Sequence, residues 1–157
     1  MSQFLPPQPP VADVRRAFLL VASQFNPEYV QGLVTHCTEE LRALSPDSDV
    51  LVHRVPGAFE IPVVVQELAR QNNPDAIVAL GVILQGETPH AQHLGQSVTH
   101  ALQQISLAHG VPVINAVLSL NNEEQAQKRC LEDEINRGTE AARAAFEMAN
   151  LLAELRK

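Results

Sequence analysis

The chain has 157 residues, of which 45% are hydrophobic and 18% charged, and its formal net charge is -7 at pH 7. This length fits a single domain that can bury a core, and the negative charge argues against a nucleic-acid-binding or anionic-membrane surface. No apolar run approaches membrane-spanning length and no signal peptide is visible, so we expect a cytoplasmic protein. Cys37 and Cys130 lack metal-ligand spacing and are expected to be reduced structural thiols.

The first part of the chain predicts a proline-rich tail followed by two strands and two helices. Prolines at positions 6, 7, 9 and 10 forbid helix over residues 1–14, so this tail is either disordered or laid along another surface. Residues 15–157 are assigned to one domain. Within it we expect a buried strand over 17–23, a helix capped by Asn26 that runs to about 44, a strand over 50–55, and a helix over 59–70.

The second part continues the alternation of strand and helix. An apolar run over 76–84 predicts a third strand, and Thr88-Pro89 is typical of a helix start because Thr can cap free N–H groups and Pro suits the first helical position. That helix is expected to end at 109, with Gly110 as its C-cap. A fourth strand over 111–118, a short helix from 121 to about 130 and a last helix from about 139 complete the chain.

The strands are continuously apolar rather than alternating, which is typical of a parallel sheet covered on both faces. The pattern predicts a three-layer α/β fold with a flavodoxin-like, four-stranded parallel sheet. Ligands of such folds bind outside the carboxyl ends of the strands. The loops expected at that edge are 24–26, 56–60, 85–90 and 119–121.

The loop 85–90 carries groups suited to an anion. A glycine turn between a strand end and a helix N-terminus offers backbone N–H donors and the positive end of the helix dipole to a phosphate. His90, in the first helical turn, can move protons near neutral pH; the alternative is an ordinary turn with a solvated histidine. His90 and His93 share a helix face, but no third ligand is close in sequence, so no metal site is expected.

Other candidate side chains lie in the remaining loops of this edge. Glu60 can accept hydrogen bonds from substrate hydroxyls or can complement a helix dipole. Phe25 can stack on a flat heterocycle or pack within its loop. Arg129 and Arg137 are candidate anion ligands or solvated surface arginines.

Together these residues resemble the lumazine synthase family, and the order and spacing of the matching segments cover nearly the whole chain from residue 17 on. The matching segments are Phe25-Asn26, VPGAFEIP at 55–62, GETPH at 86–90, VPVI at 111–114, EQA at 124–126 with Arg129, NRG at 136–138, EAA at 140–142 and EMAN at 147–150. The resemblance implies condensation of 5-amino-6-ribitylaminouracil with 3,4-dihydroxy-2-butanone 4-phosphate to 6,7-dimethyl-8-ribityllumazine, with release of phosphate and water, in riboflavin biosynthesis. It implies no metal and no organic cofactor.

The resemblance also implies a role for each site residue, with His90 as the proton carrier. Phe25 would stack on the pyrimidine, Ala58 and Glu60 would hold the ribityl chain, and Val82 and Ile83 would line the heterocycle. Phe59 would also bind substrate. Gly86, Glu87 and Thr88 would bind the phosphate, and Arg129 would add charge. Arg129 and the region of Asn115 would reach the site from a neighbouring subunit of a homopentamer, and Arg137 would also bind substrate. The short connection between Arg129 and Arg137 favours assembly of pentamers into an icosahedral shell.

Three positions depart from the pattern that the resemblance implies. Gln85 stands where Arg is frequent, Asn115 where an aromatic residue often packs on the substrate ring, and Arg137 where Lys is usual. Reduced substrate affinity is expected from these changes. They also keep open a second hypothesis, a lumazine- or flavin-binding protein that has lost turnover. A receiver-like module is disfavoured because 22–25 reads ASQF rather than an acidic cluster, and a pure scaffold is disfavoured by His90 and Arg129.

Overall fold

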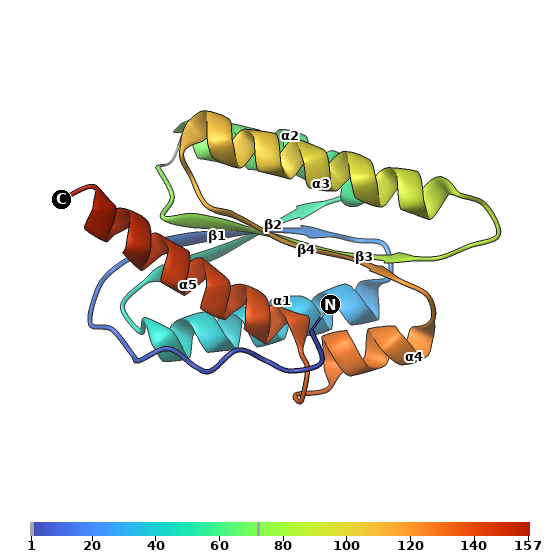
Figure 1. The fold of residues 1–157 in the computed structure, drawn as a ribbon, viewed down its shortest axis with the longest axis horizontal. Helices are drawn as coiled ribbons and strands as arrows, with labels where there is room; N and C mark the ends of the chain where they lie inside the picture. Colours follow the sequence, from blue (N-terminus) through green and yellow to red (C-terminus); the bar gives the residue numbers. More distant parts are fainter. Residues whose placement is uncertain (1, 72) are drawn as a thin grey trace.

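The computed structural model describes residues 2–71 and 73–157, and it arranges them in three layers (Figure 1). Four parallel strands form one sheet in the order β2-β1-β3-β4. Helices α2 and α3 cover one face, and α1, α4 and α5 lie on the other (Figure 1). The predicted three-layer α/β fold with a four-stranded parallel sheet is therefore confirmed.

The helices and strands follow the predicted alternation. In chain order they are β1 (Ala17–Ser23), α1 (Pro27–Leu44), β2 (Asp49–Val55), the 3₁₀ turn η1 (Ala58–Glu60), α2 (Ile61–Gln71), β3 (Ala76–Leu84), α3 (His90–His109), β4 (Val113–Leu120), α4 (Glu123–Ala126), the π-helical turn η2 (Gln127–Leu131) and α5 (Arg137–Leu155).

The sheet separates two apolar cores, and alternate residues of β1 enter each of them. Phe18, Leu20 and Ala22 pack under α1 and α5, while Leu19 and Val21 pack under α2 and α3. Both faces of the central strands β1 and β3 are buried, as their continuous apolar runs predict. The outer strands differ from the prediction: β2 and β4 are partly exposed because each is paired on one edge only.

Several predicted boundaries are wrong for local reasons. β4 begins at Val113 rather than 111, because Pro112 has no N–H to donate to a strand ladder and contributes only its carbonyl, which accepts from Ile77 N. α5 begins at Arg137 rather than about 139, because the Asn136 side chain accepts from the N–H groups of Gly138 and Thr139 and so caps the helix. Gly110 does take the predicted left-handed C-cap conformation, at φ 65°.

The proline-rich tail lies along its own chain, which the sequence left undecided. Ala12 N donates to Leu44 O at 3.0 Å, which holds the tail at the end of α1. Arg143 of α5 bonds the Pro6 carbonyl at 2.5 Å and the Glu40 carboxylate at 2.7 Å, so one guanidinium joins the tail to both helices. The tail therefore closes over the α1–α5 face as an extended segment (Figure 1).

The two cysteines are buried and unbonded, as predicted. Burial raises the pKa of the Cys37 thiol far above its ordinary value and raises the pKa of Cys130 to about 12. Both groups are therefore neutral thiols at physiological pH. Over the described part of the chain, no helix combines the length and the hydropathy needed to cross a membrane.

Candidate active site

A pocket of about 420 Å³ opens at the carboxyl edge of the sheet, where the parallel strands end. It receives side chains from the β1–α1 loop, the turn η1, the end of β3 and the first turns of α3, which are segments far apart in sequence. Its lining residues are Ser23, Phe25, Asn26, Gly57, Ala58, Phe59, Glu60, Val82, Ile83, Leu84, His90 and Leu94. The edge that the strand pattern predicted for ligand binding therefore holds a cavity.

An aromatic ring and a carboxylate meet at one side of this pocket. A Cβ atom added to Gly57 would lie 3.0 Å from ring carbons of Phe25 and 3.0 Å from Oε2 of Glu60. Glycine at this position therefore lets the ring and the carboxylate approach the backbone of the turn. Phe25 is 70% exposed, so its ring face is free to receive a planar ligand. Glu60 is also exposed, and it lies in η1 rather than in the α-helix that was predicted to contain it.

Asn26 holds the β1–α1 loop against the end of β3. Its backbone is left-handed, at φ 55° and ψ 57°, and its side-chain amide donates to the Val82 carbonyl at 2.7 Å. The predicted capping of α1 by the Asn26 side chain is therefore wrong, because that side chain is turned toward β3 instead. This bond ties the segment that carries Phe25 to the strand that carries Val82 and Ile83.

His90 begins α3 and lines the pocket. It is exposed, and no hydrogen bond fixes its ring to any residue that the structure describes. The predicted cap by Thr88 is absent: the residue before the helix is Pro89, and no side chain accepts from the first free N–H groups. The N-terminus of α3 therefore keeps donors available to a ligand. Gly86, Glu87 and Thr88 precede it as an exposed loop outside the pocket lining.

The remaining predicted site residues lie away from this pocket. Asn115 and Arg137 line a separate hollow of about 260 Å³ between β4 and α5. The Asn115 amide is engaged within the chain, since it donates to Thr99 Oγ1 at 3.1 Å and accepts from Val117 N at 3.0 Å. Arg137 is only 3% exposed and bonds the Glu140 carboxylate and the Ser2 carbonyl.

Arg129 occupies a third position, on η2, which packs against α1 and α5. Its Nε is buried without a hydrogen-bond partner in the described structure. The chain thus brings Phe25, Glu60 and His90 together but leaves the predicted cations outside their pocket.

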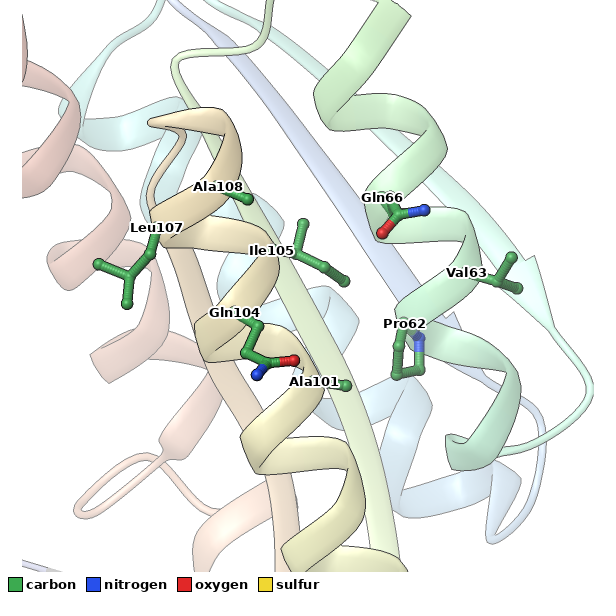
Figure 2. Close-up of a pocket in the computed structure, with 8 residues that line it drawn as sticks. All are labelled: Pro62, Val63, Gln66, Ala101, Gln104, Ile105, Leu107 and Ala108. Atoms are coloured by element: carbon green, nitrogen blue, oxygen red, sulfur yellow. The ribbon is translucent and has the colours of Figure 1, made fainter.

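A larger hollow between α2 and α3 has a different character. It measures about 800 Å³, and Figure 2 shows its lining side chains on the two facing helices. They are Pro62, Val63, Gln66, Ala101, Gln104, Ile105, Leu107 and Ala108. None of these side chains is titratable or nucleophilic, so the groove offers shape and apolar surface but no chemistry. The smaller pocket with Glu60 and His90 is the better candidate active site.

Comparison with known proteins assigns a reaction to this geometry. The 6,7-dimethyl-8-ribityllumazine synthase family matches residues 15–153. The chain belongs to this family. A 6,7-dimethyl-8-ribityllumazine synthase of Paraburkholderia phymatum is 43% identical over 137 residues, which cover 87% of this chain and 77% of the relative. Proteins of the same name from Leptothrix cholodnii and Azoarcus sp. are 41% and 39% identical, over 92% and 87% of this chain and 90% and 85% of their own lengths.

Membership confirms the predicted resemblance and the predicted activity. The chain is a lumazine synthase family enzyme, and its reaction is the condensation that forms dimethylribityllumazine in riboflavin biosynthesis. Within the described residues, no three His, Cys, Asp or Glu side chains lie close enough together to hold a metal ion.

Five lining residues of this lumazine synthase family pocket were not predicted as site residues: Ser23, Asn26, Gly57, Leu84 and Leu94. Ser23 had a usable signal, because it is a hydroxyl at the end of an otherwise apolar strand. Asn26 was assigned to a helix cap, and its bond across to β3 depends on a left-handed backbone that sequence pattern does not reveal.

Proposed function

We propose that the pocket at the carboxyl edge binds 5-amino-6-ribitylaminouracil and condenses it with 3,4-dihydroxy-2-butanone 4-phosphate. The exposed ring of Phe25 stacks on the pyrimidine, and the apolar ends of Val82 and Ile83 line the heterocycle. Ala58, Phe59 and Glu60 hold the ribityl chain, with the exposed carboxylate of Glu60 accepting hydrogen bonds from its hydroxyls. The meeting of ring and carboxylate over Gly57 supports this assignment.

The phosphate of the second substrate binds beside the N-terminus of α3. Gly86, Glu87 and Thr88 supply backbone and hydroxyl donors there, and the uncapped helix end adds positive dipole. The lining of the pocket includes no Lys or Arg, so the charge that a phosphate requires has to come from outside it. Because the pocket lacks a cation of its own, we infer that a second subunit completes the site.

We assign the missing cations to a neighbouring subunit. Asn115 and Arg137 face a hollow between β4 and α5, and Arg129 lies on η2, so none of them faces the pocket of its own chain. A head-to-tail contact presents one surface of each subunit to a different surface of the next, and repetition closes a ring. In such a ring every pocket receives Arg129 and the region of Asn115 from the adjacent chain, whereas Arg137 stays bonded to Glu140 and Ser2 of its own chain. The ring is the predicted homopentamer.

Exposed apolar side chains support such an assembly. Val63 is 66% and Leu107 75% exposed, on the two helices that border the α2–α3 groove in Figure 2, and Leu51 is 56% exposed on the edge strand β2. Such side chains are available to be buried against another subunit. The further assembly of pentamers into an icosahedral shell, and a cytoplasmic location, stay predictions.

The chemistry asks little of the protein beyond placement. Holding the amine of the pyrimidine against the carbonyl of the butanone phosphate makes the first bond formation effectively intramolecular. Imine formation then releases water, and elimination releases phosphate. His90 is the proton carrier for these steps, because its ring is exposed at the pocket and free to exchange protons with substrate.

Subunit complementation tests the shared site. Glu60→Gln disables the pocket, and Arg129→Ala disables the cationic surface, so each variant alone is expected to have little activity. Unfolding and refolding the two variants together forms mixed rings. In some of these, a chain with Arg129→Ala, whose pocket keeps Glu60, lies next to a chain with Glu60→Gln, which supplies Arg129 to that pocket. Activity should reappear in the mixture but not in either variant refolded alone. If the mixture stays as inactive as the separate variants, pocket and cations belong to one chain and the proposal is wrong.

A further inference from the structure

A serine side chain lines the candidate active site at the end of β1. Ser23 is the last residue of β1 and is only 2% exposed. Alternation along the strand places it on the same face as Leu19 and Val21, toward α2 and α3. It also lines the pocket that holds Phe25 and Glu60. Ser23 therefore ends an apolar row of side chains with one polar group, at the point where the strand meets the cavity.

The Ser23 hydroxyl has no hydrogen-bond partner in the described protein, whereas the buried polar side chains of Ser45 and Asn136 are bonded within it. Ser45 donates to the Val14 carbonyl at 2.7 Å, and the Asn136 amide is bonded on both its oxygen and its nitrogen. No hydrogen bond involves Ser23 Oγ among the described residues, and this oxygen is not one of the side-chain atoms that are both sealed from the surface and without a partner. It therefore reaches the surface of the pocket that it lines, where a ligand can supply its partner.

Gly81 leaves space beside this hydroxyl. A Cβ atom added to Gly81 would lie 3.0 Å from Ser23 Oγ, with Val117 and Ile61 side-chain carbons at 3.3 and 3.6 Å. Apolar side chains therefore border the space between Ser23 Oγ and Gly81, and this position on β3 carries no side chain. A hydroxyl in such surroundings suits a neutral polar partner that can both donate and accept.

We propose that Ser23 Oγ hydrogen-bonds a hydroxyl of the ribityl chain of the pyrimidine substrate. This inference rests on the proposed function of the pocket. The ribityl chain is the neutral polyol among the two substrates, whereas the phosphate is an anion that calls for backbone donors and cations. Glu60 and Ser23, which line the same pocket from η1 and from the end of β1, then bind the same chain. Ser23 is thus a substrate-binding residue and takes no part in proton transfer.

Ser23→Ala tests the proposal, with Ser106→Ala as a matched control. Ser106 lies in α3 outside the pocket, and its hydroxyl donates to the Val111 carbonyl at 2.7 Å. Calorimetric titration with 5-amino-6-ribitylaminouracil should give a Kd about 5-fold higher for Ser23→Ala, the size expected for one neutral hydrogen bond. The Kd of Ser106→Ala should equal that of the wild type. In steady state the KM of the butanone phosphate should be unchanged for both variants.

Thermal unfolding without substrate gives a second readout. Ser23→Ala removes a hydroxyl that has no partner within the described protein, so its Tm should equal or exceed the wild-type Tm, while Ser106→Ala breaks an internal bond and should lower it. A lower Tm for Ser23→Ala would show that the hydroxyl serves the protein rather than the ligand.

An analogue of the pyrimidine with an alkyl chain in place of the ribityl chain identifies the partner. Wild type and Ser23→Ala should bind this analogue equally. If Ser23→Ala lost the same affinity for the ribityl substrate and for the alkyl analogue, the bond would lie on the pyrimidine ring and the ribityl assignment would be overturned. If the wild type binds the ribityl substrate and Ser23→Ala binds it equally well, the role of Ser23 is wrong and the proposed function stands. A wild type that binds no pyrimidine would overturn both.

Discussion

The contact between α1 and η2 depends on a glycine, and alanine there should destabilise the protein. A Cβ atom added to Gly32 would lie 2.3 Å from the Cys130 carbonyl oxygen and 2.6 Å from a side-chain carbon of Leu131. Carbon–oxygen contacts are normally no closer than about 3.3 Å, so the two backbones would have to separate by about 1 Å. Because the obstructing atom is backbone oxygen, no side-chain rotation can relieve the overlap.

Two opposing terms set the size of the effect. Alanine in place of glycine within a helix favours folding by about 1 kcal/mol. Overpacking of a tight contact costs about 1–3 kcal/mol, and an overlap this severe with backbone lies at the upper end. The net expectation is a loss of about 1–2 kcal/mol in the free energy of unfolding, and for a chain of this length the Tm should fall by about 2–8 °C.

Thermal unfolding at one fixed protein concentration measures this loss. Gly86→Ala is the matched control, because an added Cβ there meets nothing within 4 Å, and its Tm should stay at the wild-type value. Since η2 carries Arg129, the displacement in Gly32→Ala should also raise the KM of the butanone phosphate. A Gly32→Ala variant as stable as the wild type, or more stable as helix propensity alone predicts, would refute the reasoning.

The remaining predictions concern the site residues and pH. His90→Ala should lower kcat while leaving the Kd for ribitylaminouracil nearly unchanged, and an unchanged kcat would remove His90 from the mechanism. Arg129→Ala should mainly raise the KM of the butanone phosphate; a change confined to the KM of the pyrimidine would refute its role with phosphate. Burial raises the pKa of Cys37, so this thiol stays protonated in the folded state. In the unfolded chain the same thiol ionises once the pH exceeds its ordinary pKa of about 9.0. The free energy of unfolding should therefore fall from about pH 9 upward, by about 1.4 kcal/mol per pH unit for this group. Urea unfolding at about pH 8 and about pH 10 measures this loss. Between the two, the free energy of unfolding should fall less for Cys37→Ala than for the wild type, and equal falls would show that Cys37 is not the group responsible.

The parts of the fold predicted correctly are those that local pattern controls. The apolar runs of β1 and β3 indicate buried central strands because these strands are buried on both faces, and the Gly110 cap follows from the left-handed conformation that glycine readily adopts. The errors occur where a distant partner decides the local structure. Asn26 has the composition of a helix cap, but the Val82 carbonyl, 56 residues further along the chain, takes its amide.

In the candidate active site, too, local sequence pattern predicts some residues correctly, while distant contacts decide the others. The sequence pattern places Phe25, Glu60 and His90 at one edge of the sheet because parallel strands end together there. It does not reveal that Asn115 is bonded to Thr99 and Val117, or that Arg137 is buried against Glu140 and the tail. Those contacts depend on how α3, α5 and residues 2–14 pack, and packing is set by the whole chain rather than by the spacing of a motif.

The condensation assay tests the central claim most directly. Purified protein is mixed with 5-amino-6-ribitylaminouracil and 3,4-dihydroxy-2-butanone 4-phosphate, and lumazine absorbance and phosphate release are followed against the uncatalysed reaction. The expected result is formation of both products above background by the wild type, with a sharp reduction in Arg129→Ala. No rate above background, together with tight binding of lumazine or flavin, would contradict the enzymatic assignment and indicate a binding protein.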